Sequence, residues 1–182
     1  MIRKLKIITI SGHARNGKDT VAGFLERKLK ADGYKVLITH YADLVKYVCE
    51  KYFGWDKLKD ERGRQLLQYV GTDIVRQQQP DFWVDFIKSI LTLFHSHWDY
   101  VIIPDARFPN EIEVLKRDGL DVIHLRVDRP EFDNGLTDEQ KHHPSETSLD
   151  DVVPDYIIIN NAGLSELSEQ ANTFLKEYVY EQ

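Results

Sequence analysis

A glycine-rich loop that directly follows an apolar, β-branched run is the feature that most constrains the fold. The run is residues 7–10 (IITI), and the loop continues as SGHARNGKDT over residues 11–20. Gly12, Gly17 and Lys18 have the spacing G-x-x-x-x-G-K. Glycines there let successive backbone N–H groups turn toward an anion, the lysine reaches the β- and γ-phosphates, and the helix that follows presents its positive end. The segment therefore predicts a strand, a phosphate-binding loop and a helix.

The residues after the lysine support this interpretation and also depart from the common motif. Val21, Phe24, Leu25 and Leu29 fall on one face at helical spacing, so a helix is expected to begin at the lysine rather than a plain turn with a surface lysine. The next position usually carries a hydroxyl that binds Mg²⁺. Here that position is Asp19, and Thr20 follows it.

Length and charge exclude several classes of protein. At 182 residues the chain is expected to form one domain (1–182) with a sizeable core. The net charge is −6, with 24 basic and 30 acidic residues and no basic block, so no nucleic-acid partner is expected. We predict that the single cysteine, Cys49, is buried in a reducing compartment. No leader or long apolar run is apparent, so a soluble, cytoplasmic protein with no membrane partner is expected.

Short apolar runs alternate with helical patterns along the chain. The predicted strands are 5–10, 35–39, 100–103, 122–125 and 156–159, and the predicted helices are about 18–32, 43–53, 60–79, 81–97, 109–118 and 164–179. This order favours a three-layer α/β/α fold with a five-stranded parallel sheet and ligands at the carboxyl ends of the strands. Three helical patterns between the second and third strands form a predicted substrate-binding insertion, about 41–97. The polar segment Asp128–Pro154 is a predicted lid, about 127–154.

One helical pattern carries a polar stripe that suits a nucleotide. At 100° per residue, Leu66, Leu67, Val70 and Ile74 share one face. The opposite face carries Gln65, Gln68, Thr72 and Arg76. Such a stripe is often only a solvated surface. Amides and a hydroxyl also suit the edge of a base, however, and an arginine suits a phosphate.

The segment after the third predicted strand holds further candidates. Asp105 lies at the strand tip, where a carboxylate can organise Mg²⁺, although an aspartate there can equally cap a helix or a turn. Arg107 and Glu111 form either a structural ion pair or a phosphate contact, and Arg107 is the stronger functional candidate. Arg129 lies at the hinge of the predicted lid, where closure would bring a guanidinium to a transferred phosphoryl group.

Taken together, the motifs resemble the bacteriophage-type deoxynucleoside monophosphate kinases, a branch of the P-loop nucleoside monophosphate kinases. The matching segments are SGHARNGKDTVA (11–22), YADLVK (41–46), LLQYVGTDIVR (66–76), DFWV (81–84), VIIPDARFPNE (101–111), HHPSE (142–146) and DYIIINN (155–161). The resemblance implies a P-loop kinase fold with a helical monophosphate-binding insertion and a lid. It also implies transfer of the ATP γ-phosphoryl group to a deoxynucleoside 5′-monophosphate, with Mg²⁺ as cofactor.

The resemblance and the motifs assign roles to particular residues. The predicted ATP-phosphate site is Gly12, Arg15, Asn16, Gly17, Lys18, Asp19 and Thr20. The predicted Mg²⁺ residues are Asp19, Thr20 and Asp105, and the predicted monophosphate site is Asp43, Lys46, Gln68, Thr72 and Arg76. The predicted catalytic cations are Lys18, Arg76, Arg107 and Arg129.

Two other functions stay open from the sequence. A kinase for another small acceptor, such as dephospho-coenzyme A, would phosphorylate a sugar hydroxyl and need a base, for which Asp43 is a candidate. A regulatory protein would bind ATP without transferring a phosphoryl group. The sequence also leaves open the preferred base, the choice between ribose and deoxyribose, and a homodimer. It does not decide whether Asp19 or Thr20 contacts Mg²⁺, nor what His142, His143 and Glu146 do.

Overall fold

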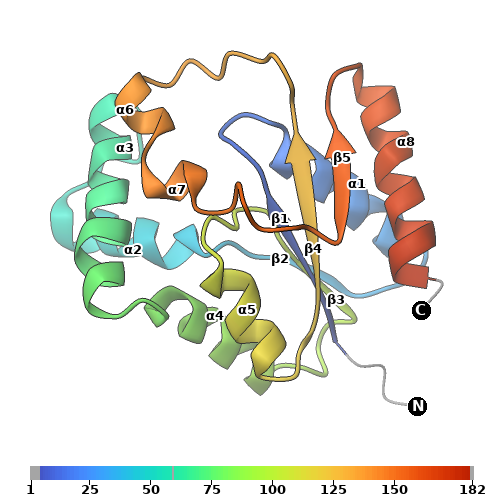
Figure 1. The fold of residues 1–182 in the computed structure, drawn as a ribbon. Coiled ribbons are helices and arrows are strands. Elements are labelled where there is room, and N and C mark those ends of the chain that lie inside the picture. The colour runs from blue at the N-terminus through green and yellow to red at the C-terminus, as the bar shows by residue number, and fades with distance from the viewer. Residues whose placement is uncertain (1–4, 59, 181–182) are drawn as a thin grey trace.

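A parallel five-stranded sheet lies at the centre of the computed structural model, which describes residues 5–58 and 60–180 (Figure 1). The strand order is β2-β3-β1-β4-β5, and every neighbouring pair is parallel. The strands are β1 (Lys6–Ser11), β2 (Val36–Ile38), β3 (Tyr100–Ile103), β4 (Asp121–Asp128) and β5 (Tyr156–Ile159). The predicted five-stranded parallel sheet is confirmed.

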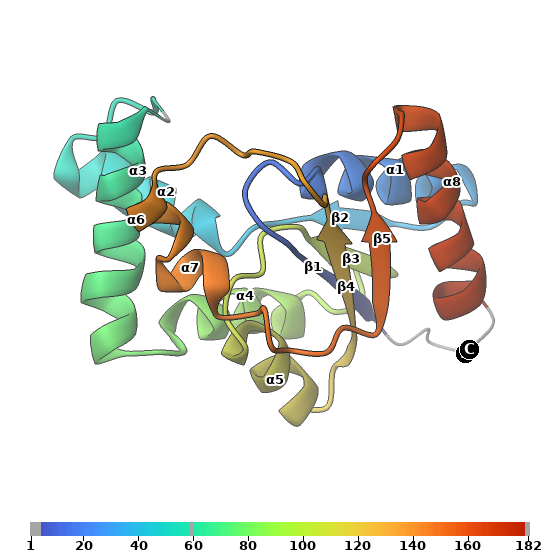
Figure 2. The same cartoon turned by 45° about the horizontal axis from the view of Figure 1, so that its top comes forward.

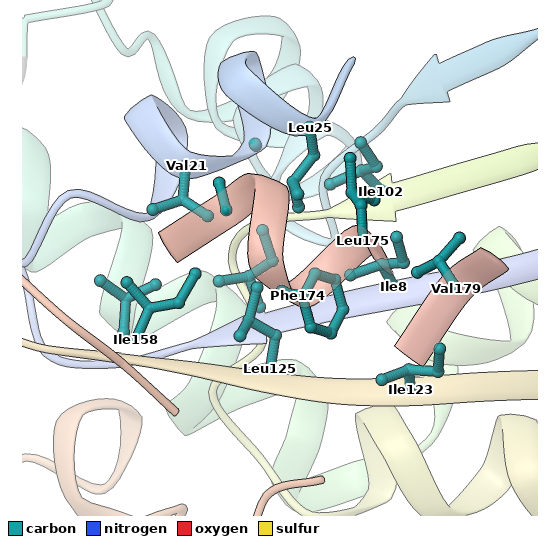
Figure 3. Close-up of a cluster of buried hydrophobic side chains, with 14 of the residues drawn as sticks. Ile8, Val21, Leu25, Ile102, Ile123, Leu125, Ile158, Phe174, Leu175 and Val179 are labelled. Atoms are coloured by element: carbon teal, nitrogen blue, oxygen red, sulfur yellow. The ribbon is translucent and has the colours of Figure 1, made fainter. Parts of the chain in front are cut away.

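Helices cover both faces of this sheet. On one face lie α1 (Lys18–Ala31), α8 (Leu164–Phe174) and the π-helix η2 (Leu175–Tyr180), and on the other lie α4 (Phe82–Leu93) and α5 (Asn110–Arg117). Figure 3 shows Phe174 and Leu175 packed with Ile8 and Leu125 of the sheet. The three-layer arrangement follows from the strands, because all six residues of β1 are buried and each face needs a cover.

Several element boundaries differ from those predicted. Strand β4 runs to Asp128, beyond the predicted end at Leu125, because residues 125–128 pair with β5. Helix α4 ends at Leu93, although the apolar pattern suggested a helix to residue 97. The predicted helix 164–179 divides into α8 and the π-helix η2. Because β1 ends at Ser11 opposite Arg126, the last two residues of β4 extend beyond the end of β1, alongside the start of the glycine-rich loop.

Between β2 and β3 the chain forms a separate group of helices. They are α2 (Ala42–Phe53), α3 (Glu61–Gln68), the π-helix η1 (Tyr69–Arg76) and α4. A small apolar cluster of Val45, Cys49, Trp55, Val70 and Trp83 holds the group together, and Cys49 is buried as predicted. The sequence predicted one helix over residues 60–79, and the structure has α3 followed by the π-helix η1 in that range.

The predicted lid segment contains two short helices that the sequence pattern did not indicate, α6 (Asp138–Lys141) and α7 (Pro144–Thr147). Thr137 and Gln140 form a capping box at the start of α6, and His143 caps α7 through the backbone N–H of Ser145. Figures 1 and 2 show α6 beside α3. The segment therefore lies next to the helical insertion, and His143 Nε2 is 3.9 Å from Asp73 Oδ1 of η1. Within the described ranges, no helix has the length and apolar composition that a bilayer crossing requires.

Candidate active site

A cavity of about 410 Å³ opens where the predicted phosphate loop, the helical insertion, the segment after β3 and the predicted lid meet. It lies beyond the carboxyl ends of β1 and β3, the edge at which ligands bind in open α/β sheets. Predicted site residues that line it are Arg15, Lys18, Asp19, Lys46, Gln68, Thr72, Arg76, Asp105 and Arg107. Those absent from its lining are Gly12, Asn16, Gly17, Thr20, Asp43 and Arg129.

Two glycines give the phosphate loop its path. Gly12 has φ +135° and Gly17 has φ +100°, backbone conformations that side-chain-bearing residues rarely adopt. A Cβ on Gly12 would overlap the carbonyl oxygen of Val127 in β4, and a Cβ on Gly17 would lie 2.7 Å from the Asn160 amide nitrogen. The backbone of β4 therefore leaves no room for a side chain at Gly12, whereas a side chain at Gly17 would be strained by its φ and would displace the Asn160 amide.

Two side-chain amides, those of Asn16 and Asn160, anchor the loop to β4 and to the residue after β5. Asn16 donates from Nδ2 to the carbonyl oxygen of Val127 at 3.1 Å, and its own carbonyl accepts a 2.8 Å hydrogen bond from Asn160 Nδ2. Asn16 is thus a buried support of the loop and does not line the cavity. Asn160, which follows β5, was not a predicted site residue. Its contact joins segments 144 positions apart, and a single sequence gives no sign of such a pair.

Lys18 begins α1 and lies inside the curve of the loop. Its Nζ donates to the carbonyl oxygens of Gly12 at 2.7 Å and His13 at 2.9 Å. Burial, with a smaller contribution from nearby Arg107, lowers the Lys18 pKa to about 7. Gly17 caps α1 without a side-chain hydrogen bond, so the cap residue leaves the first-turn N–H groups for another acceptor. A bound phosphate would reduce the repulsion between Lys18 and Arg107, and it would accept hydrogen bonds from Lys18 and from the first-turn N–H groups.

Arg76 is held rigidly at the far wall of the cavity. It forms an ion pair with Glu111, and its guanidinium stacks 4.0 Å from the centroid of the Phe108 ring. The Arg76 and Glu111 side chains are 11% and 2% exposed. Burial raises the Glu111 pKa to about 7, against the opposing effect of Arg76. This packing fixes the direction of the guanidinium, as bidentate phosphate binding requires.

Glu111 does not form the suggested side-chain ion pair with Arg107. It instead accepts the backbone N–H of Arg107 at 2.5 Å while pairing with Arg76. The Arg107 guanidinium contacts Glu146 of the lid at 2.5 Å. Arg107 therefore lies on the cavity wall with its side chain turned to the lid, and Glu111 supports the turn after β3.

Asp105 is tied to the first turn of α2. Its two carboxylate oxygens accept the backbone N–H groups of Tyr41 and Ala42, each at 3.0 Å. Burial raises its pKa, and the two N–H groups and His40 oppose that effect. These contacts correspond to the capping role considered from the sequence. Its proposed part in Mg²⁺ binding stays a prediction.

The polar stripe of the insertion faces the cavity. Gln68, Thr72 and Arg76 line it at spacings of four residues, and Arg64 extends the same line by one more step. Gln65 does not line it. Sequence reasoning missed Arg64, although the same spacing would have indicated it. It also missed His40, which follows β2 at the same sheet edge, with Nε2 3.7 Å from Asp19 and Nδ1 3.4 Å from Asp43.

Three predicted residues have other surroundings. Arg129 stacks its guanidinium 3.7 Å from the centroid of the Phe132 ring. Asp43 accepts a 3.0 Å hydrogen bond from Lys46 at the cavity rim, and Thr20 is exposed on α1. Their assigned roles remain predictions.

Protein groups alone do not build a metal centre in the part of the chain that is described. Those residues contain no cluster of three or more His, Cys, Asp or Glu side chains able to hold a metal ion. Mg²⁺ commonly binds through one or two carboxylates, water and the phosphates of its substrate. The scattered carboxylates of Asp19 and Asp105 fit that kind of binding.

The fold and site define the class of protein as a P-loop kinase. Solved structures support the fold. The Mycobacterium tuberculosis APS kinase in complex with AMPPNP and APS matches with a TM-score of 0.53 and 14% identity, covering 96% of this chain and 99% of that one. Shikimate kinase from Acinetobacter baumannii matches with a TM-score of 0.50 and 15% identity, covering 100% and 97%.

The sequence comparisons identify the family. Residues 60–171 match the model of the family described as deoxynucleotide monophosphate kinase. The deoxynucleotide monophosphate kinase of Enterobacteria phage T4 is 30% identical over 96% of this chain and 69% of its own length. A protein of Acanthamoeba polyphaga mimivirus, assigned provisionally to the same activity by its name, is 29% identical over 90% of this chain and 93% of its own. The chain belongs to the deoxynucleotide monophosphate kinase family.

Proposed function

We propose that the protein transfers the γ-phosphoryl group of ATP to a deoxynucleoside 5′-monophosphate, giving the diphosphate and ADP. One observation carries the proposal. A single cavity joins Lys18 of the predicted phosphate loop to Arg107, Arg76 and the polar stripe of α3 and η1. The phosphate loop suits the donor, and the stripe and Arg76 suit the acceptor. The family of the chain supports the same reaction.

The chemistry needs cations and positioning more than a general base. The acceptor is a phosphate that is already ionised at neutral pH, so no proton has to be removed before attack. Lys18 and the first-turn N–H groups of α1 would bind the β- and γ-phosphates of ATP, and Arg76 would hold the acceptor phosphate. Arg107 would neutralise charge on the transferring group. Such preorganised donors act most strongly where water is excluded.

Mg²⁺ is the proposed cofactor, and Asp19, Thr20 and Asp105 are its proposed protein contacts. When bound, the ion would neutralise charge on the β- and γ-phosphates. Gly12, Arg15, Asn16 and Gly17 complete the proposed ATP site, Asn16 and the two glycines by shaping the loop. Arg129 at the lid hinge is a further proposed cation, and Asp43 and Lys46 are proposed at the acceptor side. The proposed partners are therefore small nucleotides.

The other two candidate functions have less support. A kinase for a sugar hydroxyl needs a free base, but Asp43 is hydrogen-bonded to Lys46 and lies outside the cavity lining. A regulatory ATP-binding protein has no need of Arg76, which is fixed by Glu111 and Phe108 on the acceptor wall. Both features favour phosphoryl transfer to a phosphate.

The test is ADP production from Mg-ATP with each deoxynucleoside and ribonucleoside monophosphate and with dephospho-coenzyme A. We expect turnover with at least one deoxynucleoside monophosphate. Lys18→Ala should lower kcat/KM by about 10²–10³-fold, because it removes a preorganised donor from a buried phosphate site. Lys30→Ala is the matched control. Lys30 lies on the same helix and pairs with Glu26 at the surface, so wild-type turnover is expected.

The outcomes separate the candidates. Turnover only with dephospho-coenzyme A would replace the proposal with the hydroxyl-kinase alternative. ATP binding without ADP release for any acceptor would indicate the regulatory protein. Full activity of Lys18→Ala would contradict the assignment of the phosphate loop.

A further inference from the structure

A carboxylate of the predicted lid occupies Arg107 and a backbone N–H of the glycine-rich loop, two donors that are able to bind a phosphate. Glu146, in α7, accepts the backbone N–H of Ala14 in the phosphate loop through Oε2 at 2.8 Å. Its other oxygen, Oε1, lies 2.5 Å from the guanidinium of Arg107. The Glu146 side chain is only 8% exposed, and it lines the same cavity as Lys18. The contact joins segments 132 residues apart in the sequence.

Two cations, Lys18 and Arg107, lie in the neighbourhood of this carboxylate. Lys18 and Arg107 are close enough for Arg107 to lower the Lys18 pKa, and Glu146 acts on it in the opposite direction. Glu146 therefore pairs with Arg107 and, together with Asp19 and Asp105, offsets the repulsion between Arg107 and Lys18. It does so with two oxygens on a planar group, which can satisfy an N–H and a guanidinium as two oxygens of a phosphate would.

The lid holds Glu146 in place through its backbone. The Ser145 carbonyl oxygen accepts a 3.1 Å hydrogen bond from the Arg107 guanidinium, next to the Glu146 contact. Further along, Arg126 donates to the Leu149 carbonyl at 2.8 Å and to Asp150 at 3.0 Å. The end of the lid is thus fastened to the body of the protein on both sides of Glu146, and its carboxylate is presented at a defined place.

We propose that Glu146 is an internal phosphate mimic, which holds the phosphate-loop N–H and Arg107 in a receptive arrangement and competes with the phosphates of ATP for both. This proposal rests on the proposed kinase function and adds a form of regulation to the same site. The lid carboxylate must leave Ala14 and Arg107 when a phosphate takes them. The lid and the nucleotide are then coupled, because each occupies donors that the other needs.

A competitor has a signature that an ordinary structural contact lacks. Removing its charge costs stability, because Lys18 and Arg107 lose their counterion. The same change helps an anionic ligand, because the ligand no longer displaces a bound carboxylate or faces its charge. Stability and affinity therefore change in opposite directions. Substitution of a residue that only supported the fold would lower stability and ligand affinity together.

The experiment compares Glu146→Gln with the wild type. The amide keeps the size of the side chain and an oxygen for the Ala14 N–H, but it loses the charge that pairs with Arg107. Calorimetric titration with Mg²⁺ and the non-hydrolysable ATP analogue AMPPNP should give a Kd at least about fivefold lower for the variant, while its Tm falls. The matched control is Glu139→Gln, an exposed carboxylate in α6 with the same change of charge. It should leave both values near those of the wild type.

Failure of this proposal and failure of the kinase function give different results. A wild type that does not bind AMPPNP would contradict the proposed function itself. A wild type that binds, with a Glu146→Gln variant of equal or weaker affinity, would overturn only the competitor. A tightening of the same size in Glu139→Gln would also overturn it, since net charge would then be the cause.

A second measurement needs no variant and decides the matter if Glu146→Gln does not fold. Hydrogen exchange of wild-type residues 144–150 is followed with and without pyrophosphate, which offers phosphate groups but no base or acceptor. We expect exchange in this segment to become at least about threefold faster, because displacing Glu146 loosens α7. Unchanged or slower exchange at saturating pyrophosphate would overturn the proposal.

Discussion

At the scale of single residues, the phosphate loop depends on the absence of a side chain at one position. Gly12 combines φ +135° with close approach to the Val127 carbonyl in β4. Gly12→Ala would meet both obstacles, and we expect a loss of about 3 kcal/mol or more in the free energy of unfolding. The loop must also move away from β4, so AMPPNP binding should become undetectable. Urea unfolding and calorimetric titration measure the two effects.

Gly33→Ala is the control for this substitution. Gly33 also has a positive φ, +87°, but a Cβ there would meet nothing within 4 Å. Gly33→Ala should lower the free energy of unfolding only by the strain of a left-handed backbone at an alanine, about 1–2 kcal/mol. AMPPNP binding should be unchanged. Equal losses in the two variants, or normal binding by Gly12→Ala, would mean that contact with β4 does not shape the loop.

At the scale of elements, the π-helix η1 is the part of the insertion that faces the proposed acceptor. Trp83 of α4, 2% exposed, donates from Nε1 to the Gly71 carbonyl of η1 at 2.9 Å. This bond satisfies a buried carbonyl and fixes the helix that carries Thr72 and Arg76. Trp83→Phe should lower the free energy of unfolding by about 2–4 kcal/mol. It should also raise the KM of the acceptor monophosphate and leave the KM of ATP near the wild-type value.

The control is Trp98→Phe, at a partly buried tryptophan that packs against the core cluster beneath α4 and α5. It should cost stability without a change in the acceptor KM. A parallel rise in the KM values of ATP and acceptor in Trp83→Phe would argue against a specific role of η1, because general loosening of the fold would explain it.

The strands and the course of the chain from β1 through the glycine-rich loop into α1 could be predicted because their signals are local. A buried parallel strand such as β1 reads as a continuous apolar run, and the loop follows it within a few residues. The π-helix could not be predicted, because a pattern read at 100° per residue presumes an α-helix. The polar residues of η1 nevertheless face the cavity, since a spacing of four residues keeps them near one line in either helix.

The missed parts of the site depend on contacts between distant segments. Glu146 and Ala14 are 132 positions apart, and Arg76 and Glu111 are 35 apart. The order of residues along one chain does not say which carboxylate will meet which cation. The suggestion that Glu111 pairs with Arg107 relied on their nearness in sequence. The fold instead pairs Glu111 with Arg76, because the first turn of α5 places its carboxylate beside the helical insertion.

At the scale of the whole molecule, the central strand β1 and its neighbour β4 pair around a buried histidine of β4. His124 of β4 is 1% exposed and lies opposite Thr9 in the register of the sheet. Its Nε2 is 2.7 Å from Ser11 Oγ, and among the described residues its Nδ1 is a buried atom without a hydrogen-bond partner. Burial lowers the His124 pKa to about 4 from 6.5. The folded protein therefore keeps this imidazole neutral under conditions in which the unfolded chain would protonate it.

This difference makes the stability of the whole fold depend on pH. Between about pH 4 and 6.5 the unfolded chain binds a proton at His124 and the folded protein does not. The free energy of unfolding is therefore unaffected by His124 above pH 6.5 and decreases as the pH falls toward 4. We expect His124 to make the protein about 2 kcal/mol less stable at pH 5 than at pH 7. Urea unfolding at both pH values gives the change in stability for the wild type and for His124→Gln, and the difference between the two changes is the contribution of His124. Glu111, whose raised pKa affects stability with the opposite sign, is present in both proteins and cancels in this comparison.

The exposed His97 gives the matched control, because His97→Gln removes an imidazole from the surface and should keep the wild-type slope. We expect a weaker dependence of stability on pH in His124→Gln than in the wild type, because the substitution removes an imidazole that the folded protein keeps neutral at a pH where the unfolded chain protonates it. The same slope in the wild type and His124→Gln would mean that the imidazole gains its proton inside the folded sheet. The strand next to the phosphate loop would then tolerate a buried charge, and acid unfolding would have to begin elsewhere in the molecule.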